Sequence, residues 1–446
     1  MQCVWGGPPG LRRTPLVRLP GRRNQPRSNN TIQLKHKNTP VERYNPKMAL
    51  KSIFLSLFPL FLAAQPATSP IPRKLDPARL EAIEQRMKSY VDRGIIAGAV
   101  TLVARDGVIG RISATGFRDL DAKSPIKADT IFQIMSMTKP VTGVALQILV
   151  EEGKVAISDP VEKYLPEFRG QWMVSTKSAD GMTLKKPARP ITIRDLMTHT
   201  SGLPTDFPKP VQDTRYQRTL TELVDIASQL PLEFEPGTKW TYSNTGLATL
   251  GRIIEVAADQ PYEMFVQRRI LDPLGMKDTH FFPPEEKYNR ISMAYLLADG
   301  HLKKADVDYT RKGAKMPGPA GGLFSTAADL AKFYNMMLSG GALNGKRILS
   351  KASVDTMTHL HTDAIDPAGH GPGMGYGLTW TVVKDARGTT DLRAEGTYGH
   401  GGAFGTDAFV DPVRGVIGIF LIQRTSGGTS TERDTFRAMA EAAALD

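Results

Sequence analysis

A serine and a lysine three residues apart are the residues of this chain best suited to covalent chemistry. Ser136 and Lys139 stand at the start of an expected helix, where this spacing places both side chains on one face. A lysine whose amine is neutral can take the proton of a serine hydroxyl and turn that hydroxyl into a nucleophile. The positive end of the helix dipole would also favour an oxyanion beside Ser136. The pair therefore indicates acyl transfer.

The surroundings of the pair strengthen this interpretation. The apolar stripe of the expected helix consists of Val141, Val144, Ala145, Ile148 and Leu149, and Gly153 stands at its expected C-terminal cap. Apolar neighbours make Lys139 a candidate for a lowered pKa. Ser124 and Lys127 have the same spacing, but Pro125 breaks the helix register there. An isolated pair of this kind is more often a solvated surface pair, so the interpretation depends on further motifs.

Two further motifs contain groups that can act on an acyl substrate. Tyr242-Ser243-Asn244 lies in a loop that enters a helix, and a phenol and a carboxamide two residues apart can point into one cleft. His400-Gly401-Gly402-Ala403 precedes a strand, and its glycines allow the backbone to approach a substrate and offer an N–H to an oxyanion. Taken alone, the first motif is more often a surface turn and the second a tight turn with a solvated histidine.

Together and in this order, the three motifs resemble those of the serine β-lactamase and penicillin-binding-protein superfamily. The nearest likenesses are class C β-lactamases, family VIII carboxylesterases and D-aminopeptidase or DD-peptidase relatives. The resemblance covers residues 75–445 and includes the segments Ile131–Pro140, Asp159–Pro166 and Ile193–Leu203. It implies an α+β fold of the β-lactamase/transpeptidase-like type. In that fold an antiparallel sheet is flanked by the N- and C-terminal helices, and the active site lies between this α/β lobe (75–130 and 320–445) and a mostly helical lobe (131–319).

The resemblance also implies a role for each motif residue. Ser136 would be the acylated nucleophile, Lys139 its proton acceptor, and Tyr242 the shared general base for attack and for the deacylating water. The pKa of a free tyrosine is about 10, so Tyr242 could act as a base near neutrality only beside a cation such as Lys139. Asn244 would orient Lys139 and the acyl group. The residues expected at the substrate or the oxyanion are Asn244, His400, Gly401, Gly402 and Ala403, with the N–H groups of Ser136 and Ala403 forming the oxyanion hole.

The third motif departs from the superfamily's β-lactamases, which have Lys-Thr-Gly where this chain has His400-Gly401-Gly402. That lysine helps to bind a carboxylate, whereas a histidine is mostly neutral at pH 7. The difference favours an esterase or amidase acting on neutral acyl groups, and Asp206, expected to line the cleft, would further disfavour anionic substrates. The alternatives are a β-lactamase, a D-amino-acid or DD-peptidase, and a penicillin-binding sensor or scaffold that does not turn over.

A histidine-rich segment offers an alternative metal site. Its candidate ligands are His359, His361, Asp363, Asp366 and His370. Their spacing matches no common zinc signature and acyl transfer needs no metal, so we expect a polar cleft loop, no metal and no cofactor. The only cysteine is Cys3, which excludes disulfides and cysteine-ligated zinc from the rest of the chain.

The N-terminal part has the features of a targeting sequence. Residues 1–47 contain ten Lys/Arg and one acidic residue, so they carry nine of the twelve net positive charges and no nucleic-acid partner is expected of the remainder. Residues 48–66 have the charged start, short apolar run and small residues of a secretory signal peptide. We expect Met48 to be the true start, 1–47 to be an upstream extension, and the mature protein to be secreted or periplasmic without a membrane anchor. The alternative is a disordered basic tail followed by a membrane anchor.

The two ends of the domain predict one sheet. An amphipathic helix over 76–94 precedes a hairpin whose turn is Asp106-Gly107, and near the other end two strands between 405 and 422 precede a last helix. A capping box is expected where Thr326 and Asp329 open another helix. The stretches 170–190 and 359–373 are long and rich in turn formers, as in loops that shape a cleft.

Overall fold

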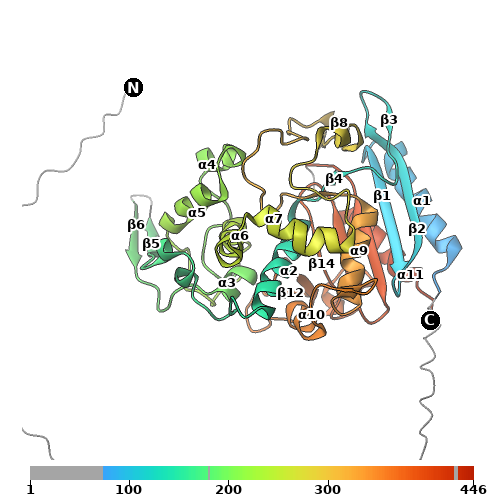
Figure 1. Cartoon of the computed structure of the whole chain (residues 1–446). Coiled ribbons are helices and arrows are strands. Elements are labelled where there is room, and N and C mark those ends of the chain that lie inside the picture. The colour runs from blue at the N-terminus through green and yellow to red at the C-terminus, as the bar shows by residue number, and fades with distance from the viewer. Residues whose placement is uncertain (1–73, 179–180, 426–429, 446) are drawn as a thin grey trace, which may run out of the picture. The chain divides into compact units, whose positions relative to one another are not determined.

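The frame of the domain is an eight-stranded antiparallel sheet. The computed structural model describes residues 74–178, 181–425 and 430–445. In order across the sheet the strands are β12 (Met374–Tyr376), β13 (Thr381–Val383), β14 (Tyr398–Gly401), β15 (Asp407–Asp411), β16 (Val416–Leu421), β1 (Gly98–Arg105), β2 (Val108–Asp119) and β3 (Ser124–Pro125) (Figure 1). Strands from the two ends of the domain meet where β1 pairs with β16. The prediction of a single sheet built from both ends is confirmed.

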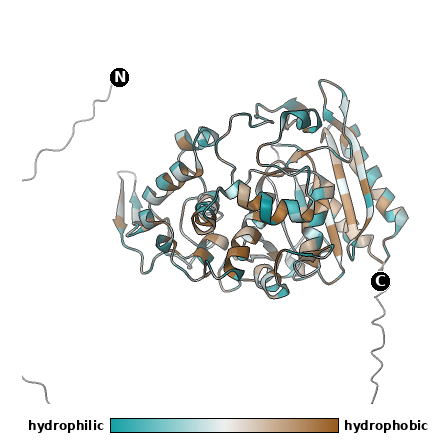
Figure 2. Cartoon of the chain, viewed as in Figure 1, coloured by the Kyte–Doolittle hydropathy of each residue, from teal (hydrophilic) through white to brown (hydrophobic). Residues whose placement is uncertain are grey.

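Helices cover both faces of this sheet. The outer face packs on α1 (Pro77–Asp92) and α11 (Ser430–Ala442), and the inner face on α9 (Ala327–Leu338). Every residue of β1 is buried. Ala99 and Val103 pack with apolar residues of α1 and α11 on the outer face, whereas Val100 and Leu102 pack with apolar residues of α9 on the inner face. Successive side chains of a strand alternate between the two faces in this way. Figure 2 shows hydrophobic residues along the central strands and hydrophilic residues on the solvent side of α1.

The sequence signals at the first helix and hairpin are confirmed. The Asp76 carboxylate accepts hydrogen bonds from the N–H groups of Ala78 and Arg79, which caps the start of α1. Asp106 and Gly107 have φ angles of 49° and 84° between β1 and β2. Two positive φ angles are what a tight hairpin turn of this kind requires.

Between residues 131 and 319 most of the regular secondary structure is helical. The helices of this segment are α2 (Thr138–Glu151), α3 (Ile193–Met197), α4 (Lys209–Asp213), α5 (Leu220–Gln229), α6 (Asn244–Ala258), α7 (Tyr262–Val266) and α8 (Asp272–Leu274). The segment also contains two hairpins, β5–β6 (Met173–Ser178 and Gly181–Lys185) and β7–β8 (Tyr295–Ala298 and His301–Lys304). The stretch 170–190, expected to shape the cleft, is the largely exposed β5–β6 hairpin, and its described residues lie outside the cavity beside Ser136.

Shorter elements complete the domain. They are β4 (Phe132–Gln133) paired with β9 (Phe324–Ser325), β10 (Ala342–Leu343) paired with β11 (Lys346–Arg347), and α10 (Lys351–Thr358). The capping box expected at α9 is only half formed. The Thr326 side chain accepts from the Asp329 N–H, but the Asp329 carboxylate accepts from the Asp278 N–H instead of returning to the cap. The Asp329 carboxylate therefore binds the loop at Asp278 and does not complete the capping box.

Helix α2 lies at the centre of the domain. It is buried from Thr138 to Leu149 and packs against α6, α7 and β14. The predicted apolar stripe is therefore only part of a helix that is buried all round. Gly153, with φ of 70°, follows its end as predicted. The burial of α2 holds its first turn rigidly against the end of β14.

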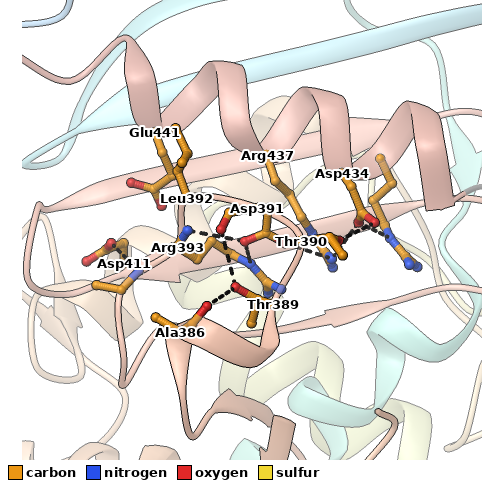
Figure 3. Close-up of polar contacts among 12 residues, drawn as sticks. Ala386, Thr389, Thr390, Asp391, Leu392, Arg393, Asp411, Asp434, Arg437 and Glu441 are labelled. Carbon is orange, nitrogen blue, oxygen red and sulfur yellow. Dashed lines mark hydrogen bonds and ion pairs between the residues drawn. The ribbon is translucent and has the colours of Figure 1, made fainter. Parts of the chain in front are cut away.

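Charged side chains fix the loop between β13 and β14 against α11 (Figure 3). Asp391 lies 3.6 Å from Arg437 on α11, and Arg437 also contacts Asp407 at the start of β15. Asp407 is the register partner of Gly401 on β14. This network therefore connects α11 to β15, the strand that pairs with β14, which carries the His400 motif.

The targeting predictions cannot be placed in this fold. The expected extension (1–47) and signal peptide (48–66) lie outside the described residues. Among the residues that are described, no helix is long and apolar enough to cross a bilayer.

Candidate active site

Ser136 lies in a strained turn at the start of α2. It belongs to the 3₁₀ turn Met135–Met137 and is half-buried. Met135 has a φ of 50°, a conformation that costs energy for a residue with a side chain. The turn is held from both sides, because the Thr138 hydroxyl donates to the Met135 carbonyl (2.7 Å) and accepts from the Leu323 N–H (3.1 Å). The fold thus fixes Ser136 where its hydroxyl is accessible.

Lys139 is buried and lies within reach of three oxygen atoms. Its Nζ is 3.2 Å from Ser136 Oγ, 2.8 Å from Asn244 Oδ1 and 2.7 Å from the Ala320 carbonyl. Burial lowers the pKa of Lys139 well below its ordinary value, and the Asp206 charge partly opposes this effect. A neutral amine would give its two N–H groups to Asn244 and Ala320, which can only accept. Its lone pair would then face the Ser136 hydroxyl.

Asp206 orients the Asn244 carboxamide. Asn244 Nδ2 donates to Asp206 Oδ1 (2.8 Å), and a carboxylate can only accept. The Asn244 oxygen must therefore face Lys139. Asp206 is exposed on the wall of the cavity beside Ser136, and Gln212 Nε2 also lies 3.4 Å from its Oδ1. Asp206 thus lines the cavity, as the sequence predicts, and its contact with Asn244 is a feature that the sequence does not predict.

Tyr242 contacts both members of the Ser136–Lys139 pair. Its hydroxyl shares a hydrogen bond with Ser136, and Lys139 Nζ lies 4.5 Å from the centroid of its ring. Burial raises the pKa of Tyr242 above its ordinary value. The phenolate expected from the sequence is therefore disfavoured in the free enzyme, because the burial that favours a neutral Lys139 also favours a neutral Tyr242.

Two backbone N–H groups are available for an oxyanion. Ser136 and Ala403 both line the cavity, and among the described residues neither N–H has a hydrogen-bond acceptor. Gly402 brings the two segments together, because a Cβ at this position would collide with the Ile134 carbonyl and with Thr406. The Thr406 hydroxyl donates to the same Ile134 carbonyl at 3.1 Å. These contacts explain the glycine and position the two donors.

His400 lies behind the site, with both ring nitrogens engaged by protein groups. It is 3 % exposed, and neither it nor Gly401 or Gly402 lines the cavity. The Tyr376 hydroxyl lies 3.1 Å from its Nε2, and the Gly401 carbonyl lies 2.7 Å from its Nδ1. Burial, and then the Lys139 charge, lower the pKa of His400. The sequence predicts that His400 contacts the substrate. In the structure it is instead a buried neutral residue that supports the site from behind.

A chain of hydrogen bonds determines which nitrogen of each histidine carries a proton. The Ser243 N–H donates to His199 Nδ1 (3.1 Å), so a neutral His199 carries its proton on Nε2. That N–H donates to the Tyr376 hydroxyl (3.0 Å). Tyr376 then donates to His400 Nε2, and His400 Nδ1–H donates to Gly401. The Tyr242–Asn244 loop is thereby joined to the β14 strand through a single arrangement of protons.

The candidate metal ligands do not converge. His361 Nε2 lies 2.8 Å from the Thr356 carbonyl, whereas the His370 ring lies 4.8 Å from the rings of Trp240 and Tyr242. Within the described ranges no three His, Cys, Asp or Glu side chains are placed to hold a metal ion. Burial, and then the Lys139 charge, lower the pKa of His370 to about 4. This residue extends the aromatic wall around Tyr242.

Several residues of the site were not found from the sequence. These are His199, Tyr376, the Ala320 carbonyl and the cavity residues Gln212, Arg215 and Tyr216. His199 lies in a segment that contributed to the family resemblance, and Tyr376 is an aromatic residue between two glycines. Those were the only available signals. A backbone carbonyl such as that of Ala320 leaves no signal in side-chain patterns.

Several known proteins are similar to this chain. The family model described as Beta-lactamase matches residues 82–443. Protein Rv1367c of Mycobacterium tuberculosis is 35 % identical over 77 % of this chain and 90 % of its own length. Esterase EstB of Burkholderia gladioli is 28 % identical over 80 % of this chain and 93 % of its own. The solved structure of EstCE1, described as a hydrolase with promiscuous acyltransferase activity, has a TM-score of 0.70 at 23 % identity, covering 82 % of this chain and 97 % of that one.

Proposed function

The chain belongs to the beta-lactamase family, and we propose that it is a carboxylesterase that cleaves small esters through an acyl-enzyme on Ser136. One observation carries the proposal. The Ser136 hydroxyl contacts both Lys139 and Tyr242 beside a cavity with two N–H groups that have no acceptor in the described part of the chain. A nucleophile, a proton acceptor, a second proton carrier and an oxyanion site are the parts that acyl transfer requires.

In the proposed acylation, Ser136 Oγ attacks the ester carbon and its proton passes to the neutral Lys139 amine. The N–H groups of Ser136 and Ala403 hold the resulting oxyanion. When the tetrahedral intermediate collapses, the bond to the alcohol breaks and the leaving oxygen takes the proton of Tyr242. Lys139 returns its proton to Tyr242, 4.5 Å from the ring centroid. Both residues are neutral again when the acyl-enzyme has formed.

Deacylation reverses these roles. Water attacks the acyl carbon and gives a proton to the Tyr242–Lys139 pair, and the Ser136 oxygen recovers a proton as the acid leaves. The assignment of the first proton to Lys139 rests on the opposite effects of burial on the two pKa values. Tyr242 then acts as a neutral proton carrier.

The state of His400 favours an ester over a β-lactam or a peptide with a free C-terminus. A buried neutral imidazole with both nitrogens engaged offers no positive charge to a carboxylate on the leaving side. The similarity to an esterase supports the same choice. We therefore regard β-lactam hydrolysis as a weak side activity.

The test compares three substrates with the wild type and Ser136→Ala. We expect multiple turnovers on p-nitrophenyl butyrate, little on nitrocefin or a D-alanyl peptide, and loss of activity in the variant. Ser124→Ala is the matched control, because Ser124 has the same spacing to a lysine but lies outside the cavity. A stoichiometric burst without turnover would indicate a sensor, and turnover on nitrocefin alone would indicate a β-lactamase.

We also propose that the protein is exported, on the strength of the pattern in residues 48–66. Mass spectrometry of the protein from the cell exterior or periplasm should then find an N-terminus shortly after residue 66. Peptides from residues 1–47 in a whole-cell digest would contradict the expected start at Met48.

A further inference from the structure

The cavity beside Ser136 has an apolar wall and a polar wall. Its volume is about 150 Å³, the size that accommodates a benzene-sized group. The apolar lining comes from Met135, Phe207, Tyr216, Ala248, Met316 and Pro319. Charged side chains reach it from Asp206 and Arg215. A cavity of this kind selects a short group that ends in a polar function.

Among the described residues, no carboxylate forms an ion pair with the Arg215 guanidinium. Arg215 follows α4 in the turn Arg215–Gln217 and is half-buried. Its Nη1 donates to the Gln212 carbonyl (2.7 Å), and its Cζ lies 4.5 Å from the Tyr216 ring centroid. Across the described ranges it forms no ion pair, and most of its N–H groups remain available.

A second guanidinium packs against the Tyr216 ring without lining the cavity. Arg311 is 4 % exposed, and its Cζ lies 4.6 Å from the same Tyr216 ring. Its side chain donates to the carbonyls of Gly321 and Gly322, and it too has no ion-pair partner in the described part of the chain. The Asp308 carboxylate accepts from the backbone N–H groups of Thr310 and Arg311 and from the Thr310 hydroxyl, not from the Arg311 guanidinium. Two guanidinium groups thus pack against Tyr216, and neither forms an ion pair with a carboxylate of the described residues.

The side of Ser136 on which this cavity lies determines which part of a substrate it holds. In the proposed mechanism the leaving group takes a proton from Tyr242, and Tyr242 does not line the cavity. The acyl group must therefore occupy the cavity. Asp206, the other charged group there, is engaged by Asn244 and Gln212 rather than by Arg215.

We propose that Arg215 determines specificity by binding a carboxylate at the far end of the substrate's acyl group. The preferred substrates would then be monoesters of short dicarboxylic acids. A planar guanidinium suits a carboxylate because it can donate two parallel hydrogen bonds. The inference rests on the proposed function. It also revises the expectation of neutral acyl groups, because Arg215 adds a cation to the cavity that Asp206 lines.

The test measures kcat/KM for mono-p-nitrophenyl glutarate and for p-nitrophenyl butyrate, which share a leaving group and differ in the terminal carboxylate. The wild type should prefer the glutarate ester. Arg215→Gln should lower kcat/KM for that ester about ten- to hundredfold, the range of a hydrogen bond to a charged group. The loss for butyrate should be much smaller, because this ester has no terminal carboxylate. Arg215→Lys should recover part of the loss.

Arg268→Gln is the matched control, because Arg268 is exposed, contacts only Gln260 among described side chains, and lies outside the cavity. Arg268→Gln should leave kcat/KM unchanged for both esters. Equal losses of kcat/KM on both esters in Arg215→Gln, or no loss on the glutarate ester, would overturn the role of Arg215. The proposed function would still hold in that case, provided that butyrate hydrolysis depends on Ser136. Absence of hydrolysis of both esters by the wild type would instead defeat the proposed function itself.

Discussion

The Tyr376 hydroxyl lies 3.1 Å from Nε2 of His400, and it donates to this nitrogen because the Gly401 carbonyl keeps the proton of the neutral histidine on Nδ1. Tyr376 also accepts from His199, so one phenol joins the loop before α6 to strand β14. Both histidines are fully enclosed, and burial lowers the pKa of each. A histidine in place of the lysine of related β-lactamases is therefore part of the scaffold.

Replacing Tyr376 with Phe should destabilise the protein by about 1–3 kcal/mol, because two buried imidazole nitrogens lose their partner. Urea unfolding measures the change. Tyr334→Phe is the control, since the buried Tyr334 hydroxyl has no hydrogen-bond partner among the described residues and its loss should cost little. Equal stabilities of the two variants would contradict the hydrogen-bond chain.

Asp206→Asn should shift the acidic limb of the pH–rate profile to lower pH. The Asp206 charge raises the pKa of Lys139, so its removal makes the amine easier to deprotonate. Activity rises as pH increases through the pKa of the acceptor, and kcat/KM reports that pKa for the free enzyme. Asparagine can still accept the hydrogen bond from Asn244. A shift to higher pH, or none, would show that Lys139 does not control this limb.

Gly402→Ala should lower kcat by about tenfold or more, because the new methyl group would push the Ala403 N–H away from the oxyanion position. Steady-state kinetics on p-nitrophenyl butyrate measure the effect. Gly371→Ala serves as the control, since a Cβ there meets open space. If both variants keep wild-type kcat, Ala403 does not stabilise the transition state.

Glu441→Gln should remove a pH dependence of stability. Burial, and then the charge of Asp411, raise the pKa of Glu441 to about 8. Between its ordinary value of 4.5 and about 8, the folded state holds a proton that the unfolded chain releases. Stability therefore falls as pH rises through this window, by at most about 1.4 kcal/mol per unit. Figure 3 shows the residue above the network of Asp391 and Arg437.

Urea unfolding at pH 6 and pH 9 provides the measurement for this change. The free energy of unfolding of the glutamine variant minus that of the wild type should be larger at pH 9 than at pH 6. The same difference at both pH values would mean that Glu441 titrates normally.

The sequence predicted those features that depend on local pattern. The Asp76 cap, the Asp106-Gly107 hairpin and the sheet built from both ends follow from spacing and turn chemistry, and each is confirmed. The proximity of Ser136 and Lys139 also follows from helical spacing. The family resemblance, rather than any local rule, brought the Tyr242 loop to them.

Other features depend on tertiary contacts that spacing does not encode. The side chain of His400 turns away from the cavity because Tyr376, from a distant strand, binds its ring. Arg215 lines the cavity because of the path of the chain after α4. The raised pKa of Tyr242 results from burial, which the sequence does not reveal.

Intact-protein mass spectrometry after rapid acid quenching of the enzyme with p-nitrophenyl butyrate tests whether Ser136 forms an acyl-enzyme. We expect a mass increase equal to one butyryl group, located by peptide mapping on Ser136 and absent from Ser136→Ala. Hydrolysis without any covalent adduct, or an adduct on another residue, would show that Ser136 is not the nucleophile.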